Sequence, residues 1–282
     1  MSISGPNAEQ ADYWSTAGLS WIDNEAAQDA ILAPVSGFLV ENSGFEPGMR
    51  VLDIGCGTGG HALAVAEQVG PEGEVLALDV SRPFLDRVEA RTAAVGAPVR
   101  TLHGDAQIAD LPGGFDLATS RFGVMFFADP GAALANIARA LRPGGRMVFA
   151  AWAPVAVNPF WRVPAAVAAA RLGRPEASPP NSPGPMGLSD IAFVEAQLAR
   201  SGLAETSVRT ETVVLGHVGG AAEMAAQCLR TGPAAHIARV FDATEADRAA
   251  IIADLTEALS DYEDSEGFRM PATLNIIEAR AG

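Results

Sequence analysis

The sequence has few cysteines, few basic residues and no long apolar run. Its two cysteines, Cys56 and Cys228, lie far apart, which argues against a disulfide framework or cysteine-based zinc cluster and predicts a reducing, cytoplasmic location. The 19 Lys and Arg residues face 34 Asp and Glu, and the net charge of -15 disfavours nucleic acid as a partner. No run approaches the roughly 18 apolar residues of a membrane span, and the start of the chain predicts no secretion signal.

Length and composition predict a globular protein that is larger than one minimal domain. At 282 residues, 49% of them hydrophobic, the chain can bury a substantial core. We expect one domain that carries sizeable insertions.

Apolar strands alternate with helical segments between residues 50 and 152. In one such helix Asp129 fits the N-cap, Pro130 the first helical position and Gly144 the terminator. The alternation predicts an α/β fold, a Rossmann-like doubly wound sheet, mostly parallel with a C-terminal antiparallel strand, and a ligand at the carboxyl ends of its strands.

The flanking segments predict a helical N-terminal arm and helical insertions that form a cap. In the insertion before the final strand, Ile251, Leu255 and Leu259 lie on one helix face, which we expect to pack against the sheet. The predicted division is a helical arm over 1–44, a sheet core over 45–153, a lid-like insertion rich in Pro, Gly and Ser over 154–188, completion of the core over 189–218, a helical cap over 219–267 and a final core strand over 268–282.

A glycine-rich loop lies between the first predicted strand and the following helix, in VLDIGCGTGGHAL, residues 51–63. Glycines there allow a tight turn and close approach of a ligand to the backbone. Gly55, Gly57 and Gly60 satisfy G-x-G-x-x-G, so a dinucleotide-dependent oxidoreductase is one interpretation. Asp53, Asp79 and the segment HGDA end three neighbouring strands and share one sheet edge.

Five motifs follow one another in order along the chain: VLDIGCGTGG, VLALDVS, HGDA, FDLATSRFGVMFFADP and LRPGGRMVFAAW. In this order and spacing the chain resembles the class I S-adenosylmethionine-dependent methyltransferases, in particular the broad group similar to ubiquinone and menaquinone biosynthesis methyltransferases. The resemblance covers residues 49–152. It implies S-adenosylmethionine as cofactor and methyl transfer as the activity.

The resemblance also implies a role for each motif position. The Asp53 position helps to hold the ammonium of the cofactor, Asp79 the ribose, and Asp105 the adenine amine. The implied cofactor contacts are Asp53, Gly55, Cys56, Gly57, Asp79, Val80, Asp105, Ala106, Arg121 and Phe122. Many relatives in quinone biosynthesis carry histidines after the fourth strand, whereas this chain has the apolar stretch FGVMFFADP, which indicates an apolar wall beside the methyl group.

The sequence gives weaker signals for the residues that would act on the methyl acceptor. No motif supports a general base, and His217 and His236 are the weak candidates, because His61 and His103 lie within the cofactor motifs. No histidine pair has metal-ligand spacing, so we expect no metal.

The arm and insertions carry the candidate acceptor contacts, and their composition favours a small amphipathic or apolar molecule. These contacts are Trp14, Trp21, Trp161, Met224 and Arg230. A non-catalytic regulatory protein that binds S-adenosylmethionine remains an alternative, and a homodimer remains open.

Overall fold

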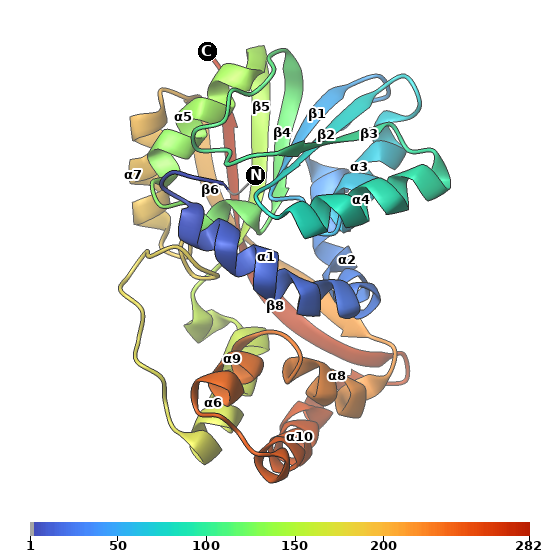
Figure 1. The fold of residues 1–282 in the computed structure, drawn as a ribbon, viewed down its shortest axis with the longest axis vertical. Helices are drawn as coiled ribbons and strands as arrows, with labels where there is room; N and C mark the ends of the chain where they lie inside the picture. Colours follow the sequence, from blue (N-terminus) through green and yellow to red (C-terminus); the bar gives the residue numbers. More distant parts are fainter. Residues whose placement is uncertain (1–2) are drawn as a thin grey trace.

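A computed structural model describes residues 3–282 as an eight-stranded sheet flanked by helices (Figure 1). The strands are β1 (Arg50–Ile54), β2 (Glu74–Asp79), β3 (Val99–His103), β4 (Phe115–Arg121), β5 (Leu141–Trp152), β6 (Ala204–His217), β7 (Glu263–Asp264) and β8 (Gly267–Arg280). The α-helices are α1 (Ala8–Asp23), α2 (Glu25–Asn42), α3 (Gly60–Val69), α4 (Arg82–Val95), α5 (Pro130–Ala140), α6 (Pro159–Leu172), α7 (Ile191–Ser201), α8 (Gly220–Cys228), α9 (Pro233–Val240) and α10 (Glu245–Leu259).

The order of the strands is β3-β2-β1-β4-β5-β8-β6, and β7 pairs with β8. Strands β1 to β5 are parallel, and β8 runs antiparallel to both β5 and β6. The predicted Rossmann-like, mostly parallel sheet with an antiparallel C-terminal strand is therefore confirmed. The chain leaves β1 in one direction and β4 in the other, so a crevice is expected at the carboxyl ends of these two strands.

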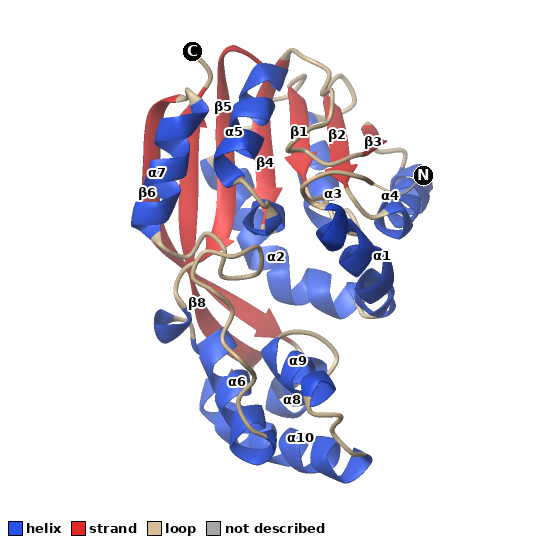
Figure 2. Ribbon diagram, turned by 60° about the vertical axis from the view of Figure 1, so that its left-hand side comes forward, coloured by secondary structure: helices blue, strands red, loops and turns tan. Residues whose placement is uncertain are grey.

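Helices cover both faces of the sheet (Figure 2). Helices α2 and α3 contact each other, and α3 also contacts β1 and β2. Helices α5 and α7 pack together on the opposite face. Because both faces are covered, a central strand such as β1 has no solvent-facing side, and its residues from Val51 to Ile54 are all buried.

The helix before β5 shows one correct and one wrong prediction. The Asp129 side chain caps α5 by accepting a hydrogen bond from Ala132 N, as predicted. Gly144 does not end this helix, which stops at Ala140. Gly144 instead lies within β5 at a φ of 73°, where its N–H donates to Ala281 O. The glycine is therefore part of an inner strand of the sheet.

The N-terminal arm consists of two helices that break at Asn24. The Asn24 side chain donates to Ser20 O, so it competes with the backbone bonds that would continue the helix. Helix α1 packs against α4, and α2 packs against α3 and β6. Figure 1 shows α1 crossing in front of the sheet at the end where the cap begins.

The cap lies on an extension of the sheet. Strand β5 ends at Trp152, which pairs with Leu274, whereas β6 and β8 remain paired as far as His217 and Phe268. This two-stranded extension carries α6, α8, α9 and α10 (Figure 1). One continuous apolar core extends from the parallel sheet into these helices.

One expectation about the insertions is wrong. Helix α10 buries Ile251, Leu255 and Leu259 against α8 and α6, so the stripe does not pack on the parallel sheet. In the insertion over 154–188, helix α6 packs on α9 and α10, and the Pro-, Gly- and Ser-rich stretch after it, residues 173–188, contains no helix or strand. None of the helices within residues 3–282 has the length and apolar character required to cross a bilayer.

Candidate cofactor site

The glycine loop after β1 touches the turn after β4. A Cβ added to Gly55 would lie 2.6 Å from Gly123 Cα, and both loops therefore need a bare backbone at this point. Gly55, Gly57 and Gly59 have positive φ values of 66°, 55° and 88°, which favour glycine. A Cβ at Gly60 would collide with the Asp29 carboxylate of α2. The loop is thus held between the second half of the arm and the carboxyl edge of the sheet.

Asp79 at the end of β2 organises this edge. Its Oδ2 accepts from Gly57 N at 2.9 Å and its Oδ1 from Ser81 N at 2.8 Å, so one carboxylate joins the glycine loop to the start of α4. Burial raises the pKa of Asp79 to about 6, although these backbone donors act in the opposite direction. Each oxygen retains a second acceptor position that a ligand hydroxyl could use.

Asp53 in β1 is a buried carboxylate whose two oxygens have no hydrogen-bond partner. Burial raises its pKa to about 7, while the nearby Arg121 guanidinium lowers it and Asp79 raises it further. Arg121 donates to Ser36 Oγ at 3.0 Å and lies 3.6 Å from the Asp29 carboxylate. A buried carboxylate without donors is costly for the fold and suits a cationic ligand group.

Asp105, after β3, has one occupied and one free oxygen. Its Oδ1 accepts from Asn7 Nδ2 and Gln107 N, each at 2.9 Å, whereas its buried Oδ2 has no partner. Ala106 beside it is buried, and its carbonyl accepts from Asn136 Nδ2. The free oxygen provides an acceptor for a ligand N–H.

Neither Cys56 nor the two nearby histidines is placed for catalysis. Burial and the Asp79 and Asp53 charges raise the pKa of the Cys56 thiol well above its ordinary value, so it is not a thiolate nucleophile. His61 hydrogen-bonds to Thr119 Oγ1 at 3.0 Å beneath the loop, and burial lowers its pKa to about 3. His103 donates to Val80 O at 2.9 Å and so fixes the backbone next to Asp79.

Arg91 of α4 is a loop contact that the sequence motifs do not contain. It donates to Thr58 O at 2.9 Å in the glycine loop and forms an ion pair with Asp29 at 2.8 Å. Glu25 lies 3.7 Å from the same guanidinium and pairs with Arg87 as well. This group of charges joins the arm, the loop and α4. It could not be read from sequence, because the carboxylates lie on α2 and the arginines on α4, and no local pattern shows that these two helices meet.

An aromatic cluster lies where β4 and β5 end. Phe122 has a φ of 70°, an unfavourable value for a bulky side chain, and its ring stacks on Trp152 with centroids 4.3 Å apart. Trp152 stacks in turn on Phe160 of the cap at 5.5 Å and meets Trp161 edge-on at 5.7 Å. The indole N–H of Trp161 is buried without an acceptor. This strained conformation lies after β4, next to the switch between β1 and β4 where a ligand is expected.

The other predicted acceptor contacts lie in two separate places. Trp14 and Trp21 pack edge-to-face at 6.1 Å on the arm, and Trp14 also meets Phe126 of the apolar stretch after β4 at 5.2 Å. Met224 is buried in the cap core, and Arg230 is exposed at the turn after α8. The structure therefore does not bring these five residues together in one cluster.

The two candidate histidine bases lie in the cap. His217 pairs with Phe268, six residues beyond the Leu274 partner of Trp152, which is roughly 20 Å along the strand. Its Nδ1 accepts from Gly219 N. His236 on α9 contacts Arg239, and burial together with that charge lowers its pKa. No hydrogen bond or ion pair among the described residues links either histidine to the glycine loop.

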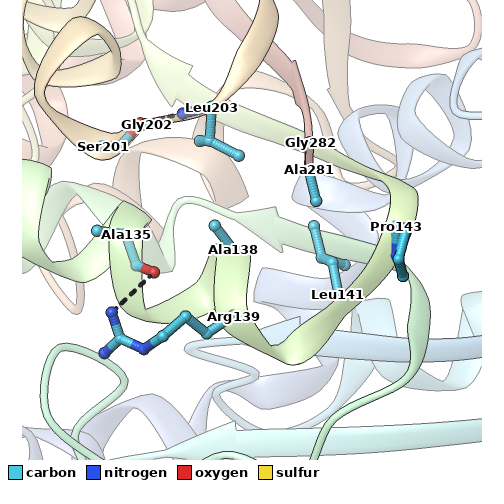
Figure 3. Close-up of a pocket in the computed structure, with 10 residues that line it drawn as sticks. All are labelled: Ala135, Ala138, Arg139, Leu141, Pro143, Ser201, Gly202, Leu203, Ala281 and Gly282. Carbon is cyan, nitrogen blue, oxygen red and sulfur yellow. Dashed lines mark hydrogen bonds between the residues drawn. The ribbon is translucent and has the colours of Figure 1, made fainter.

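One hollow lies away from this edge (Figure 3). It measures about 320 Å³ and is lined by α5, the start of β5 and the C-terminal Gly282. The hollow lies at the amino end of β5, and no Asp or Glu side chain lines it. Residues 3–282 contain no group of three His, Cys, Asp or Glu side chains placed to hold a metal ion.

Comparison with known sequences finds a family match for the part of the chain that contains the glycine loop. Residues 51–145 match the family described as the methyltransferase domain. The uncharacterized protein Rv1405c of Mycobacterium tuberculosis is 31% identical over 155 residues, which cover 54% of this chain and 56% of the relative. The demethylmenaquinone methyltransferase of Staphylococcus aureus is 36% identical over 113 residues, 39% of this chain and 46% of the enzyme. The chain thus spans about half the length of the curated relatives it matches.

Solved structures share the fold at low sequence identity. The YcgJ protein of Bacillus subtilis superposes with a TM-score of 0.52 at 19% identity, over 87% of this chain and 97% of that one. A protein of Bacillus halodurans described as a candidate methyltransferase gives a TM-score of 0.53 at 17% identity, over 87% and 98% of the two chains. Nothing in these matches supports the dinucleotide alternative. The sequence match and the doubly wound sheet together identify residues 51–145 as a domain of the class I S-adenosylmethionine-dependent methyltransferase family.

Proposed function

We propose that this protein transfers the methyl group of S-adenosylmethionine to a small, apolar or amphipathic acceptor. The observation that carries the proposal is the set of unfilled acceptors around the glycine loop: both oxygens of Asp53 and Oδ2 of Asp105, all buried and without partners. S-adenosylmethionine has an ammonium and an adenine amine that could supply the missing donors. Such a fit explains why the fold retains carboxylates that are costly when unpaired.

The residues that would hold the cofactor follow from this arrangement. Asp53 would take the ammonium, Asp79 the ribose hydroxyls and Asp105 the adenine amine, while Gly55 and Gly57 allow close approach to the backbone. When bound, S-adenosylmethionine supplies a methyl group activated by its sulfonium. The remaining tasks of the chain are to orient an acceptor and to exclude water.

The aromatic cluster supports an apolar acceptor. Phe122, Trp152 and Phe160 offer flat apolar faces at the strand ends, and the indole N–H of Trp161 is the one buried side-chain donor in this cluster that lacks an acceptor. We propose that the molecule to be methylated binds there and carries one group that accepts a hydrogen bond from the Trp161 indole N–H. The cytoplasmic location, the homodimer and the division into domains stay predictions.

Thermal unfolding with added ligands tests the cofactor. S-adenosylhomocysteine at micromolar concentration should raise the melting temperature, and NAD should leave it unchanged. Release of S-adenosylhomocysteine from S-adenosylmethionine in the presence of a panel of phenols, hydroxyquinones and aromatic acids then tests the acceptor class. Stabilisation by NAD alone would refute the proposal, as would turnover only with strongly charged, non-aromatic acceptors.

A further inference from the structure

Asn7 lies immediately before α1 and is buried against the adenine end of the proposed site. Its Nδ2 donates to Asp105 Oδ1 at 2.9 Å and to Gln107 Oε1 at 3.1 Å. Its Oδ1 accepts from Ala128 N at 2.7 Å. Both amide hydrogens and the carbonyl are therefore used, and their pattern of donors and acceptors permits only one orientation of the amide.

These bonds divide the Asp105 carboxylate into two unlike oxygens. Asn7 and Gln107 N both donate to Oδ1, while the buried Oδ2 receives nothing. An ionised carboxylate only accepts hydrogen bonds, so the free oxygen can pair with an amine but would repel a carbonyl at the same place. The side chain that fixes the carboxylate belongs to the arm, 98 residues away in sequence.

We infer that Asn7 is a positioning residue that gives the site its preference for an amine-bearing base, adenine over hypoxanthine. The inference rests on the proposed function, since it assumes that the cofactor base lies at Asp105. With Asn7 in place, Oδ2 is held toward the ligand. Without it, the carboxylate can rotate and loses one of the two donors that stabilise its charge, so recognition of the amine weakens more than binding of the rest of the nucleoside.

Calorimetry with S-adenosylhomocysteine and S-inosylhomocysteine, which differ in this one group, tests the inference. The unaltered protein should prefer the adenine compound at least about tenfold. In Asn7→Ala this preference should shrink at least about threefold, because the affinity for the adenine compound falls more. Gly18→Val is the matched control: a side chain there would press on the Phe84 ring, which lies 3.0 Å from an added Cβ, and would loosen the arm without altering Asp105. Its preference should stay unchanged while both affinities fall together.

The outcomes separate the two proposals. If the unaltered protein binds neither compound, the proposed function fails. If it binds the adenine compound but Asn7→Ala lowers both affinities equally or changes neither, only the role of Asn7 is refuted. Should Asn7→Ala not fold, Asn7→Asp provides the same test, since a carboxylate in place of the donor should also reduce the preference at pH 8.

Discussion

At the scale of single residues, the Asp79 carboxylate has two tasks. Its carboxylate joins Gly57 to Ser81 and would also accept the ribose hydroxyls. Asp79→Ala should reduce the affinity for S-adenosylhomocysteine at least about tenfold, because hydrogen bonds to a charged group contribute roughly 1.5–3 kcal/mol. Calorimetry measures the affinity, and circular dichroism checks the fold. An affinity equal to that of the unaltered protein would contradict the assignment.

The Asp53 carboxylate should stabilise the complex with the cofactor and destabilise the ligand-free protein. Its ordinary pKa of 3.8 applies to the unfolded chain, and its folded value is about 7. Between these values the folded state binds more protons, so the stability of the ligand-free protein falls as pH rises from about 4 to about 7. Above pH 7 the buried charge remains without a donor.

Asp53→Asn should therefore raise the melting temperature of the ligand-free protein at pH 8 by a few degrees, since one kcal/mol corresponds to about 2–4 °C in chains of this size. The same variant should lose most of its affinity for S-adenosylhomocysteine. Cofactor affinity of the unaltered protein should fall as pH decreases through about 7, because protonated Asp53 no longer attracts an ammonium. A lower melting temperature for Asp53→Asn at pH 8 would show that the carboxylate has a partner in solution.

At the scale of secondary-structure elements, the arginines of α4 allow a matched comparison. Arg91 and Arg87 both contact Glu25, but of the two only Arg91 donates to the carbonyl of Thr58. Arg91→Gln should weaken S-adenosylhomocysteine binding about three- to tenfold because the loop is less well held. Arg87→Gln removes an exposed pair and should change affinity less than about twofold. Equal effects in calorimetry would assign the role to the ion pairs rather than to the loop contact.

We expect the cap helices to bind the methyl acceptor and the sheet core to bind the cofactor. Trp161→Ala and Arg230→Ala alter residues of α6 and of the turn after α8. Both should lower turnover of the acceptor that the panel identifies, yet leave S-adenosylhomocysteine binding within about threefold, a change below roughly 0.7 kcal/mol. Proportional losses of turnover and cofactor binding would mean that these elements stabilise the core instead.

The sequence predicted those elements whose signals are local. The buried run of β1, the cap of α5 by Asp129 and the glycine loop each depend on neighbouring residues, and each was found where expected. The paths of α10 and of the extended β6–β8 pair depend on which apolar faces meet in three dimensions. The contact between Asn7 and Asp105 bridges 98 residues and has no motif. Pattern and spacing cannot reveal such contacts.

At the scale of the whole molecule, the arm lies across the edge where the cofactor is proposed to bind. Asn7 touches Asp105, and the Trp14 carbonyl accepts from Ser81 next to Asp79. Bound S-adenosylhomocysteine should therefore slow backbone hydrogen exchange over residues 8–23 as well as in the glycine loop, because release of the arm would expose the ligand. Protection limited to the loop, with no change over these arm residues, would show that the ligand and α1 bind independently.

The extension of β6 and β8 beyond Trp152 has a consequence for how this chain tolerates change. Past that point the two strands bond to each other and to the short β7, not to the parallel sheet. The segments 153–190 and 218–266 can therefore be lengthened, shortened or exchanged between homologues without breaking a hydrogen bond of the parallel sheet. Helix α6 comes from the first segment and packs against α9 and α10 from the second. Libraries that exchange the two segments together, as a matched pair, should therefore yield folded proteins that methylate new acceptors more often than libraries that vary either segment alone.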